Sequence, residues 1–171
     1  MTAPIPTGVL RPRVRLVSDG AYHSEVRALV AAAERSLLCS LFIVDPLPLS
    51  DSELIVDELL EDLAAARWRG VDVRLLLGGS RDNFGIAQTA DLARARALQL
   101  DIPCRWLTSH KVRGSHAKFV VADDYVLTGS HNWSAGAFGD QTQDSVLVLS
   151  PDFAAHVAAL FQQQWSRAFV K

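Results

Sequence analysis

The sequence predicts an α/β fold in which a mixed β-sheet is sandwiched between helices. Three observations predict it. Over the first hundred residues, segments with a strand pattern alternate with segments of helical periodicity. Two of the strand segments are almost uniformly apolar, which is typical of strands covered on both faces. The remaining residues indicate a hairpin, a further strand and a final helix, so part of the sheet is antiparallel.

The composition is that of one soluble globular domain. The chain has 171 residues, of which 49% are hydrophobic and 21% are charged. We expect a flexible N-terminal arm at residues 1–12 and a single domain at residues 13–171. The net charge of −2 gives no support to nucleic-acid binding by bulk charge, so such binding needs a local patch.

The cellular location is expected to be cytoplasmic. The N-terminus lacks the apolar segment of a signal peptide, and no apolar run is long enough to span a membrane. Cys39 and Cys104 lie far apart in apolar surroundings. We therefore expect two buried free thiols rather than a disulfide.

The first two thirds of the chain alternate strands and helices. We expect strands at residues 14–17, 37–44, 71–77 and 102–107. We expect helices from Ser18 or Asp19 to Glu34, from Ser50 or Asp51 to Gly70, and from about Thr89 to Leu100. Ser and Asp are good N-caps, and Gly70 suits a helix end.

The last third begins with a predicted β-hairpin. Two short hydrophobic runs, Phe119–Ala122 and Tyr125–Thr128, flank an Asp-Asp pair that suits a tight turn. Residues 145–149 follow as a strand. Pro151 then opens a final helix with one apolar face.

The hairpin carries the residues that suggest chemistry. His116 and Lys118 are two residues apart, so an extended strand points both to one face. The hairpin is followed by Gly129-Ser130-His131-Asn132. If this segment is extended, the side chain of His131 is expected to point to the opposite side from that of Asn132. An imidazole, an ammonium and an adjacent polar turn together make an anion-binding site.

The pattern H-x-K-x4-D at His116, Lys118 and Asp123, followed by G-S-x-N from Gly129 to Asn132, resembles the phospholipase D superfamily. The resemblance is sharpest from Ser115 to Val148. It implies the phospholipase D-like fold. It also implies phosphodiester hydrolysis or transfer through a covalent phosphohistidine, without a metal or other cofactor.

The resemblance also implies residue roles. His116 is expected to attack phosphorus through Nε2, while Lys118 and Asn132 hold the non-bridging oxygens and Ser130 assists. Asp123 is expected to be structural, because it falls at the hairpin turn an odd number of residues from His116. Gly129 completes the structural part of the motif.

The sequence departs from the family pattern at the acidic partner of the nucleophilic imidazole. Related nucleases carry Asn-x-Glu where this chain has Gln141-Thr142-Gln143 followed by Asp144. By register, Gln143 takes the Glu position and would contact substrate. A one-residue shift of the strand would instead bring Asp144 to the imidazole. We favour Asp144 as this catalytic acid.

Only one H-x-K occurs in the chain, whereas the implied mechanism needs one imidazole to attack and another to protonate the leaving oxygen. We therefore expect a homodimer whose active site lies on the two-fold axis, with one His116 from each copy.

Three further residues are candidates for binding substrate. Lys111 and Arg113 could contact phosphates beyond the scissile one, or belong to a solvated loop with incidental charge. Trp133 could stack on a base, although a Trp in such a place more often caps the core.

Three functions remain open on the sequence. The leading one is a nuclease for DNA or RNA, because short single-motif members resemble bacterial endonucleases. The second is a phospholipid phosphodiesterase or phosphatidyltransferase, with an apolar entrance from Phe84, Ile86 and Phe138. The third is a catalytically weakened nucleic-acid-binding subunit of a larger complex, suggested by Gln143.

Overall fold

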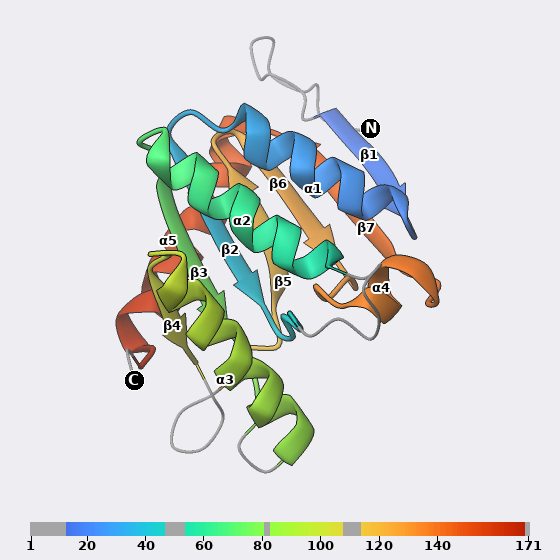
Figure 1. The fold of residues 1–171 in the computed structure, drawn as a ribbon. Coiled ribbons are helices and arrows are strands. Elements are labelled where there is room, and N and C mark those ends of the chain that lie inside the picture. Colours follow the sequence, from blue (N-terminus) through green and yellow to red (C-terminus); the bar gives the residue numbers. More distant parts are fainter. Residues whose placement is uncertain (1–12, 47–53, 81–82, 108–113, 170–171) are drawn as a thin grey trace, which may run out of the picture.

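The computed structural model describes residues 13–46, 54–80, 83–107 and 114–169, which build a seven-stranded sheet with flanking helices (Figure 1). The predicted arm at residues 1–12 lies outside the described residues. In chain order the elements are β1 (Arg13–Ser18), α1 (Ala21–Ala32), β2 (Ser36–Leu41), α2 (Ile55–Trp68), β3 (Asp72–Leu77), α3 (Phe84–Gln99), β4 (Cys104–Trp106), β5 (Lys118–Ala122), β6 (Tyr125–Gly129), α4 (Ala135–Gly139), β7 (Asp144–Leu149) and α5 (Pro151–Arg167).

The sheet is mixed, which confirms the predicted fold class. Its strand order is β1-β7-β6-β5-β2-β3-β4. The pairs β2–β3 and β3–β4 are parallel, and the other four pairs are antiparallel. The first and seventh strands therefore lie side by side, although almost the whole chain separates them.

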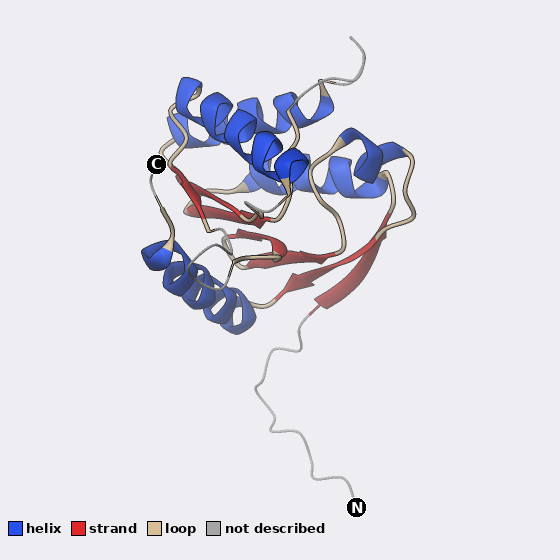
Figure 2. Cartoon of the chain, turned by 90° about the horizontal axis from the view of Figure 1, so that it is seen from below, coloured by secondary structure: helices blue, strands red, loops and turns tan. Residues whose placement is uncertain are grey.

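Helices cover both faces of the sheet (Figure 2). Side chains of α1, α2 and α3 form the larger core cluster with one face, and α5 packs on the other face. Along β2, Leu37 and Cys39 belong to the first cluster while Leu38 belongs to the second. This double burial explains why the strand reads as a continuous apolar run. Cys39 and Cys104 are free thiols, as predicted, and burial raises the pKa of each to about 12.

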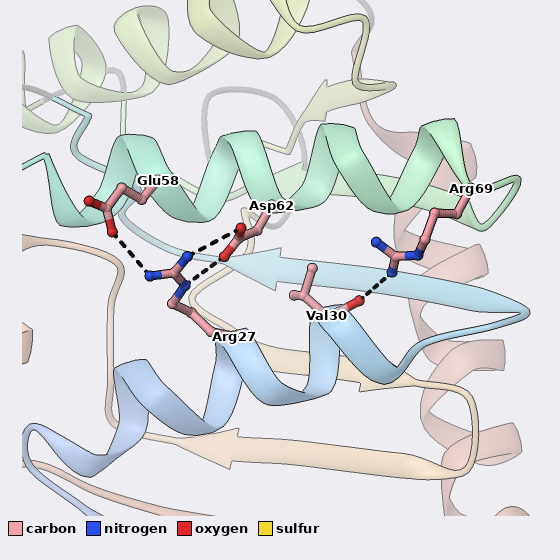
Figure 3. Close-up of polar contacts among 5 residues, drawn as sticks. All are labelled: Arg27, Val30, Glu58, Asp62 and Arg69. Carbon is pink, nitrogen blue, oxygen red and sulfur yellow. Dashed lines mark hydrogen bonds and ion pairs between the residues drawn. The ribbon is translucent and has the colours of Figure 1, made fainter.

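Polar contacts connect α1 and α2, which lie on the same face of the sheet (Figure 3). Arg27 of α1 donates to Asp62 at 2.8 Å and to Glu58 at 3.3 Å. At the other end of the helix pair, Arg69 donates to the carbonyl oxygen of Val30 at 2.8 Å. Because Arg27 and Glu58 are about half exposed, these ion pairs align the helices more than they stabilise the fold.

Several element ends differ from the sequence prediction. Helix α3 begins at Phe84 rather than near Thr89, because the side chain of Asn83 accepts a hydrogen bond from the backbone N–H of Ile86. The short helix α4 was not predicted and is capped by Ser134. None of the helices that the structure describes has the length and apolar character needed to span a lipid bilayer.

The start of α1 also differs from the prediction, because neither Ser18 nor Asp19 caps it. The N-cap is Gly20, which has no side chain to bond to the helix. Asp19 instead adopts a positive φ of 49°, and its carboxylate accepts from the backbone N–H of Gln143 at 2.8 Å. The predicted caps of α2, Ser50 and Asp51, lie outside the described residues.

Candidate active site

The register of the sheet brings the segments that carry His116, Lys118 and the G-S-x-N motif to one edge, at the lower side of Figure 1. Leu41 at the end of β2 pairs with Lys118 at the start of β5. Gly129 at the end of β6 pairs with Ser145 near the start of β7. The same edge receives the end of β1 and the end of β3. Residues far apart in the sequence therefore meet at this edge.

His116 and Lys118 form a close pair there. Nζ of Lys118 lies 3.2 Å from Nδ1 of His116 and also donates to the His116 carbonyl oxygen at 3.2 Å. An ammonium can only donate, so Nδ1 accepts while Lys118 is charged. Lys118 is half-buried, and this burial lowers its pKa. The imidazole is exposed, so an incoming anion can reach both groups.

An aromatic ring lies against this pair. Phe42 directly follows β2, and its ring centroid is 4.0 Å from that of His116, with the planes tilted by 40°. Nζ of Lys118 is 5.1 Å from the Phe42 centroid, within the range of a cation–π contact. The His-Lys pair therefore has an apolar support on one side and solvent on another.

The approach of these segments depends on Gly78, just after β3. A Cβ atom at Gly78 would collide with the carbonyl oxygen of Ser115, and it would lie 3.0 Å from Cα of Phe42. Ser115 is buried, and its Oγ accepts from the backbone N–H of Ala117 at 3.2 Å. Gly78 therefore makes room for the segment before His116, a role that no local sequence pattern reveals.

Asp123 occupies the turn of the hairpin with a φ of 52°. Its carboxylate accepts from the backbone N–H groups of Glu34, Arg35 and Ser36 at 2.9 to 3.0 Å. Burial by itself raises the pKa of Asp123, but these three donors and the Arg35 guanidinium outweigh it and lower the pKa. Asp123 thus ties the hairpin to the start of β2, away from His116.

His131 is fully buried and fixes the polar turn after β6. Its ring stacks on Tyr22 of α1 at 4.1 Å, and its Nε2 lies 3.2 Å from the carbonyl oxygen of Asp19. A carbonyl only accepts, so Nε2 carries the hydrogen, and Nδ1 accepts from Ser145 Oγ at 2.8 Å. Burial lowers the pKa of His131, which favours this neutral form.

The motif residues next to His131 lock β6 to β7. The backbone N–H of Ser130 donates to the carbonyl oxygen of Asp144 at 2.9 Å, and Ser130 Oγ accepts from the N–H of Asp144 at 3.1 Å. A Cβ at Gly129 would collide with the Asp144 carbonyl oxygen and with Ser145. Asn132 follows, half-buried, and among the described residues its Oδ1 has no hydrogen-bond partner.

The structure does not support the preference for Asp144 as the imidazole partner. Ser145 faces α1 through its bond to His131, so its strand neighbour Asp144 faces the other way. There Ser18 Oγ donates to the Asp144 carboxylate at 2.6 Å. Lys118 pairs with Leu41, which belongs to the cluster under α1 and α2, and so faces the same side as Ser145. The one-residue shift does not occur.

Gln143 lies two residues before Ser145. An extended backbone therefore points Gln143, rather than Asp144, to the face of the sheet that Ser145 and Lys118 share. Its amide nitrogen donates to Oε1 of Gln141 at 2.7 Å. Its backbone N–H and carbonyl group both bond to Asp19. The position that the family pattern gives to an acid thus carries a neutral amide, fixed to the turn that follows β1.

Residues 26–165 match the sequence model of a family described as cardiolipin synthase, PLD-like domain. This match covers most of the chain. The chain belongs to the PLD-like (phospholipase D-like) family. It is thereby placed among the phosphodiester hydrolases. No curated protein sequence matches it significantly.

Solved structures share this PLD-like fold at low sequence identity. The phospholipase D family member Nuc from Salmonella typhimurium is 22% identical, with a TM-score of 0.72 over 92% of this chain and 97% of Nuc. NucT from Helicobacter pylori is 14% identical, with a TM-score of 0.71 over 93% and 99%. Phosphatidylserine synthase from Haemophilus influenzae Rd KW20 is 12% identical, with a TM-score of 0.71 over 87% of this chain and 36% of the synthase.

Other predicted site residues of this PLD-like domain have different outcomes. Trp133 is fully buried and belongs to the core. Its ring is therefore not accessible for stacking on a base. Its backbone bridges the segment after β2 through Ile43 and Asp45. Lys111 and Arg113 lie outside the described residues. Within the described ranges, no three His, Cys, Asp or Glu side chains gather as a metal site.

The sequence interpretation missed two contributors to the PLD-like site. Phe42 was assigned to the interior of a strand predicted to run to Val44, whereas β2 ends at Leu41 and leaves Phe42 beside His116. His131 was predicted only to point to the side opposite Asn132. Its buried stack on Tyr22 depends on a contact between distant parts of the chain, which no local pattern reveals.

Proposed function

We propose that this PLD-like protein is a metal-independent nuclease that cleaves DNA or RNA through a covalent phosphohistidine on His116. The observation that carries the proposal is the exposed His116 imidazole, held 3.2 Å from the Lys118 ammonium at an open edge of the sheet. A nucleophile next to a cation is what a phosphodiester anion requires.

In the proposed first step, the Nε2 lone pair of His116 attacks phosphorus and the bond to the leaving oxygen breaks. A second imidazole donates the proton that this oxygen needs. Water then attacks the phosphohistidine, the N–P bond breaks, and the second imidazole takes the proton from the water. Lys118 and Asn132 bind the non-bridging oxygens, while Ser130 holds the turn that positions Asn132.

The second imidazole comes from another copy of the chain. The three remaining described histidines do not serve. His23 packs on Phe138 with its Nε2 buried, His131 is buried by Tyr22 and Ser145, and His156 lies on α5. A two-fold homodimer that brings the two sheet edges together supplies one His116 from each copy. Charge for nucleic-acid binding would come from Lys118 and from Lys111 and Arg113.

We favour nucleic acid over lipid as substrate, because the apolar entrance that a lipid would need is only partly present. The lipid alternative, a phospholipid phosphodiesterase or phosphatidyltransferase, relies on an apolar entrance. Phe84 is exposed, but Phe138 is buried beside Tyr22 and His23 and cannot line that entrance.

A second candidate is a nucleic-acid-binding subunit with weakened catalysis. The observation that favours it is the neutral Gln143 at the family's acid position, because an amide stabilises a developing imidazolium less than a carboxylate does. Under this candidate the chain binds phosphodiesters and turns them over slowly.

The test incubates the protein with plasmid DNA, single-stranded DNA, RNA, and vesicles of phosphatidylcholine or cardiolipin, each with and without EDTA. We expect cleavage of nucleic acid that survives EDTA and is lost in His116→Ala but kept in the matched control His156→Ala. Lipid turnover alone would favour the lipid enzyme. Binding without turnover, unchanged by Gln143→Glu, would favour the binding subunit, and an activity that EDTA abolishes would contradict the proposal.

A further inference from the structure

Phe42 is placed where it contacts both members of the His-Lys pair. The cross-strand pairing of Leu41 with Lys118 brings the residue after β2 next to the residues before β5. The Phe42 ring then lies 4.0 Å from the His116 ring and 5.1 Å from Nζ of Lys118. Ring contacts of this kind are directional, since an aromatic face attracts a cation and favours particular angles to a second ring.

The backbone around Phe42 is built for this contact. Gly78 has no side chain and so leaves room for Phe42. An added Cβ at Gly78 would lie 3.0 Å from Cα and 3.2 Å from Cδ2 of Phe42. The same glycine makes room for the carbonyl oxygen of Ser115, the residue before His116. Phe42 and Ser115, the residue before His116, therefore both lie against Gly78 just after the end of β3.

Among the residues that the structure describes, no carboxylate is hydrogen-bonded to the His116 ring. A carboxylate bonded to the second ring nitrogen fixes both the tautomer and the ring angle. Here Asp144 faces Ser18, and Gln143 donates to Gln141. The hydrogen bond found at the His116 ring comes from Lys118, which must also bind phosphate. An orienting contact that does not compete with substrate has to come from elsewhere.

We infer that Phe42 is a positioning residue: its ring holds the His116 imidazole and the Lys118 ammonium in the orientation needed for attack on phosphorus. This inference rests on the proposed function. Phe42 does not touch the reacting atoms, and its effect on the rate is exerted through His116. An imidazole that turns away from the line of attack loses rate steeply while substrate binding is little affected.

The test compares Phe42→Leu and Phe42→Tyr with the matched control Phe119→Leu. Phe119 is adjacent to Lys118 but faces the other side of the sheet, where it packs on Phe161. We expect Phe42→Leu to lower kcat by roughly tenfold with KM nearly unchanged, and Phe42→Tyr to retain most of the rate. We expect Phe119→Leu to lower Tm without a comparable loss of kcat.

A second measurement follows the ¹⁵N and ring-proton resonances of His116, assigned with His116→Ala. Loss of the Phe42 ring should shift them in Phe42→Leu but not in Phe119→Leu. Unchanged resonances, or a loss of kcat that follows Tm equally in both Leu variants, would overturn the inference. A wild-type protein without any turnover would refute the proposed function instead, and the resonances would still decide on Phe42.

Discussion

The ammonium nitrogen of Lys118 lies 3.2 Å from Nδ1 of His116. While Lys118 is charged, Nδ1 accepts this bond, so the neutral imidazole carries its hydrogen on Nε2, the atom proposed to attack. Under the proposed function, a bound phosphodiester offers Lys118 the phosphate oxygens as partners. We then expect the ring hydrogen to lie on Nδ1, which leaves the Nε2 lone pair free to attack phosphorus.

The first prediction concerns Gln143→Glu. A carboxylate at this position can accept from Nδ1–H and stabilise the imidazolium, so we expect kcat to rise by at least roughly tenfold. The control is Gln141→Glu, which adds the same charge two residues away on an exposed side chain. Steady-state rates on the cleaved nucleic acid make the comparison. Equal changes in both variants would show a general charge effect and contradict the predicted role of Gln143.

Asp144→Asn tests the other acid. Its carboxylate faces Ser18, so we expect kcat to stay within about threefold of wild type. The weakened bond to Ser18 should lower the free energy of unfolding by about 1 kcal/mol in chemical denaturation. A loss of kcat of two orders of magnitude would restore Asp144 as the catalytic acid suggested by the sequence.

Lys118 makes the alkaline side of the pH profile informative. Burial disfavours the charged amine and lowers its pKa, so the phosphate-binding charge is lost at a lower pH than for an ordinary lysine, whose pKa is 10.5. We expect log(kcat/KM) to fall with rising pH below that value. In Lys118→Arg this fall should disappear from the accessible range, whatever the absolute rate. A rate that rises through the same range would instead mean that the neutral amine is the active form.

Asp123 should govern stability rather than chemistry. Asp123→Ala leaves three backbone N–H groups without their acceptor, so we expect a loss of about 3 kcal/mol in the free energy of unfolding. The neighbouring Asp124→Ala removes only an exposed pair with Arg35 and should cost less than about 1 kcal/mol. Similar losses in the two variants would contradict the assignment.

The same carboxylate predicts an acid dependence. The folded-state pKa of Asp123 lies below the ordinary value of 3.8, so its contribution to stability is fully present above that pH. It is lost as the pH falls from there through the folded-state pKa. Denaturation of wild type and Asp123→Ala at pH 7 and at pH 2 to 3 measures this difference, which should shrink in acid.

The proposed homodimer can be tested directly. Light scattering should give twice the 18.7 kDa mass of one chain. Because both imidazoles belong to one site, mixed dimers of wild type and His116→Ala should be far less than half as active as wild type. Mixing with His156→Ala should leave the rate unchanged. A monomer with full activity would refute the shared site.

The sequence predicted those parts of the fold that local patterns encode. The two short hydrophobic runs on either side of Asp123-Asp124 located β5 and β6 to within one residue. The buried runs located β2 and β3 as strands covered on both faces. The H-x-K and G-S-x-N spacings predicted which loops meet. Their meeting follows from antiparallel pairing, which turns separations along the chain into neighbours across the sheet.

The parts that could not be predicted depend on contacts between distant segments. The choice between Gln143 and Asp144 turned on strand register, which is fixed by the partner β6 and by the bond between Ser18 and Asp144. Phe42 became a site residue because β2 ends at Leu41. Periodicity does not mark that end, since Phe42, Ile43 and Val44 continue the apolar run.

The link between His131 and the β1–α1 turn also governs when the site can form. His131 and Asp19, which that link joins, are 112 residues apart, and β7 must pair with β1 for the turn after β6 to be held from both sides. Under the proposed function, a nascent chain that ends at the H-x-K segment contains His116 but not β7, which holds the turn after β6. We therefore expect hydrolytic activity only after β7 has been synthesised.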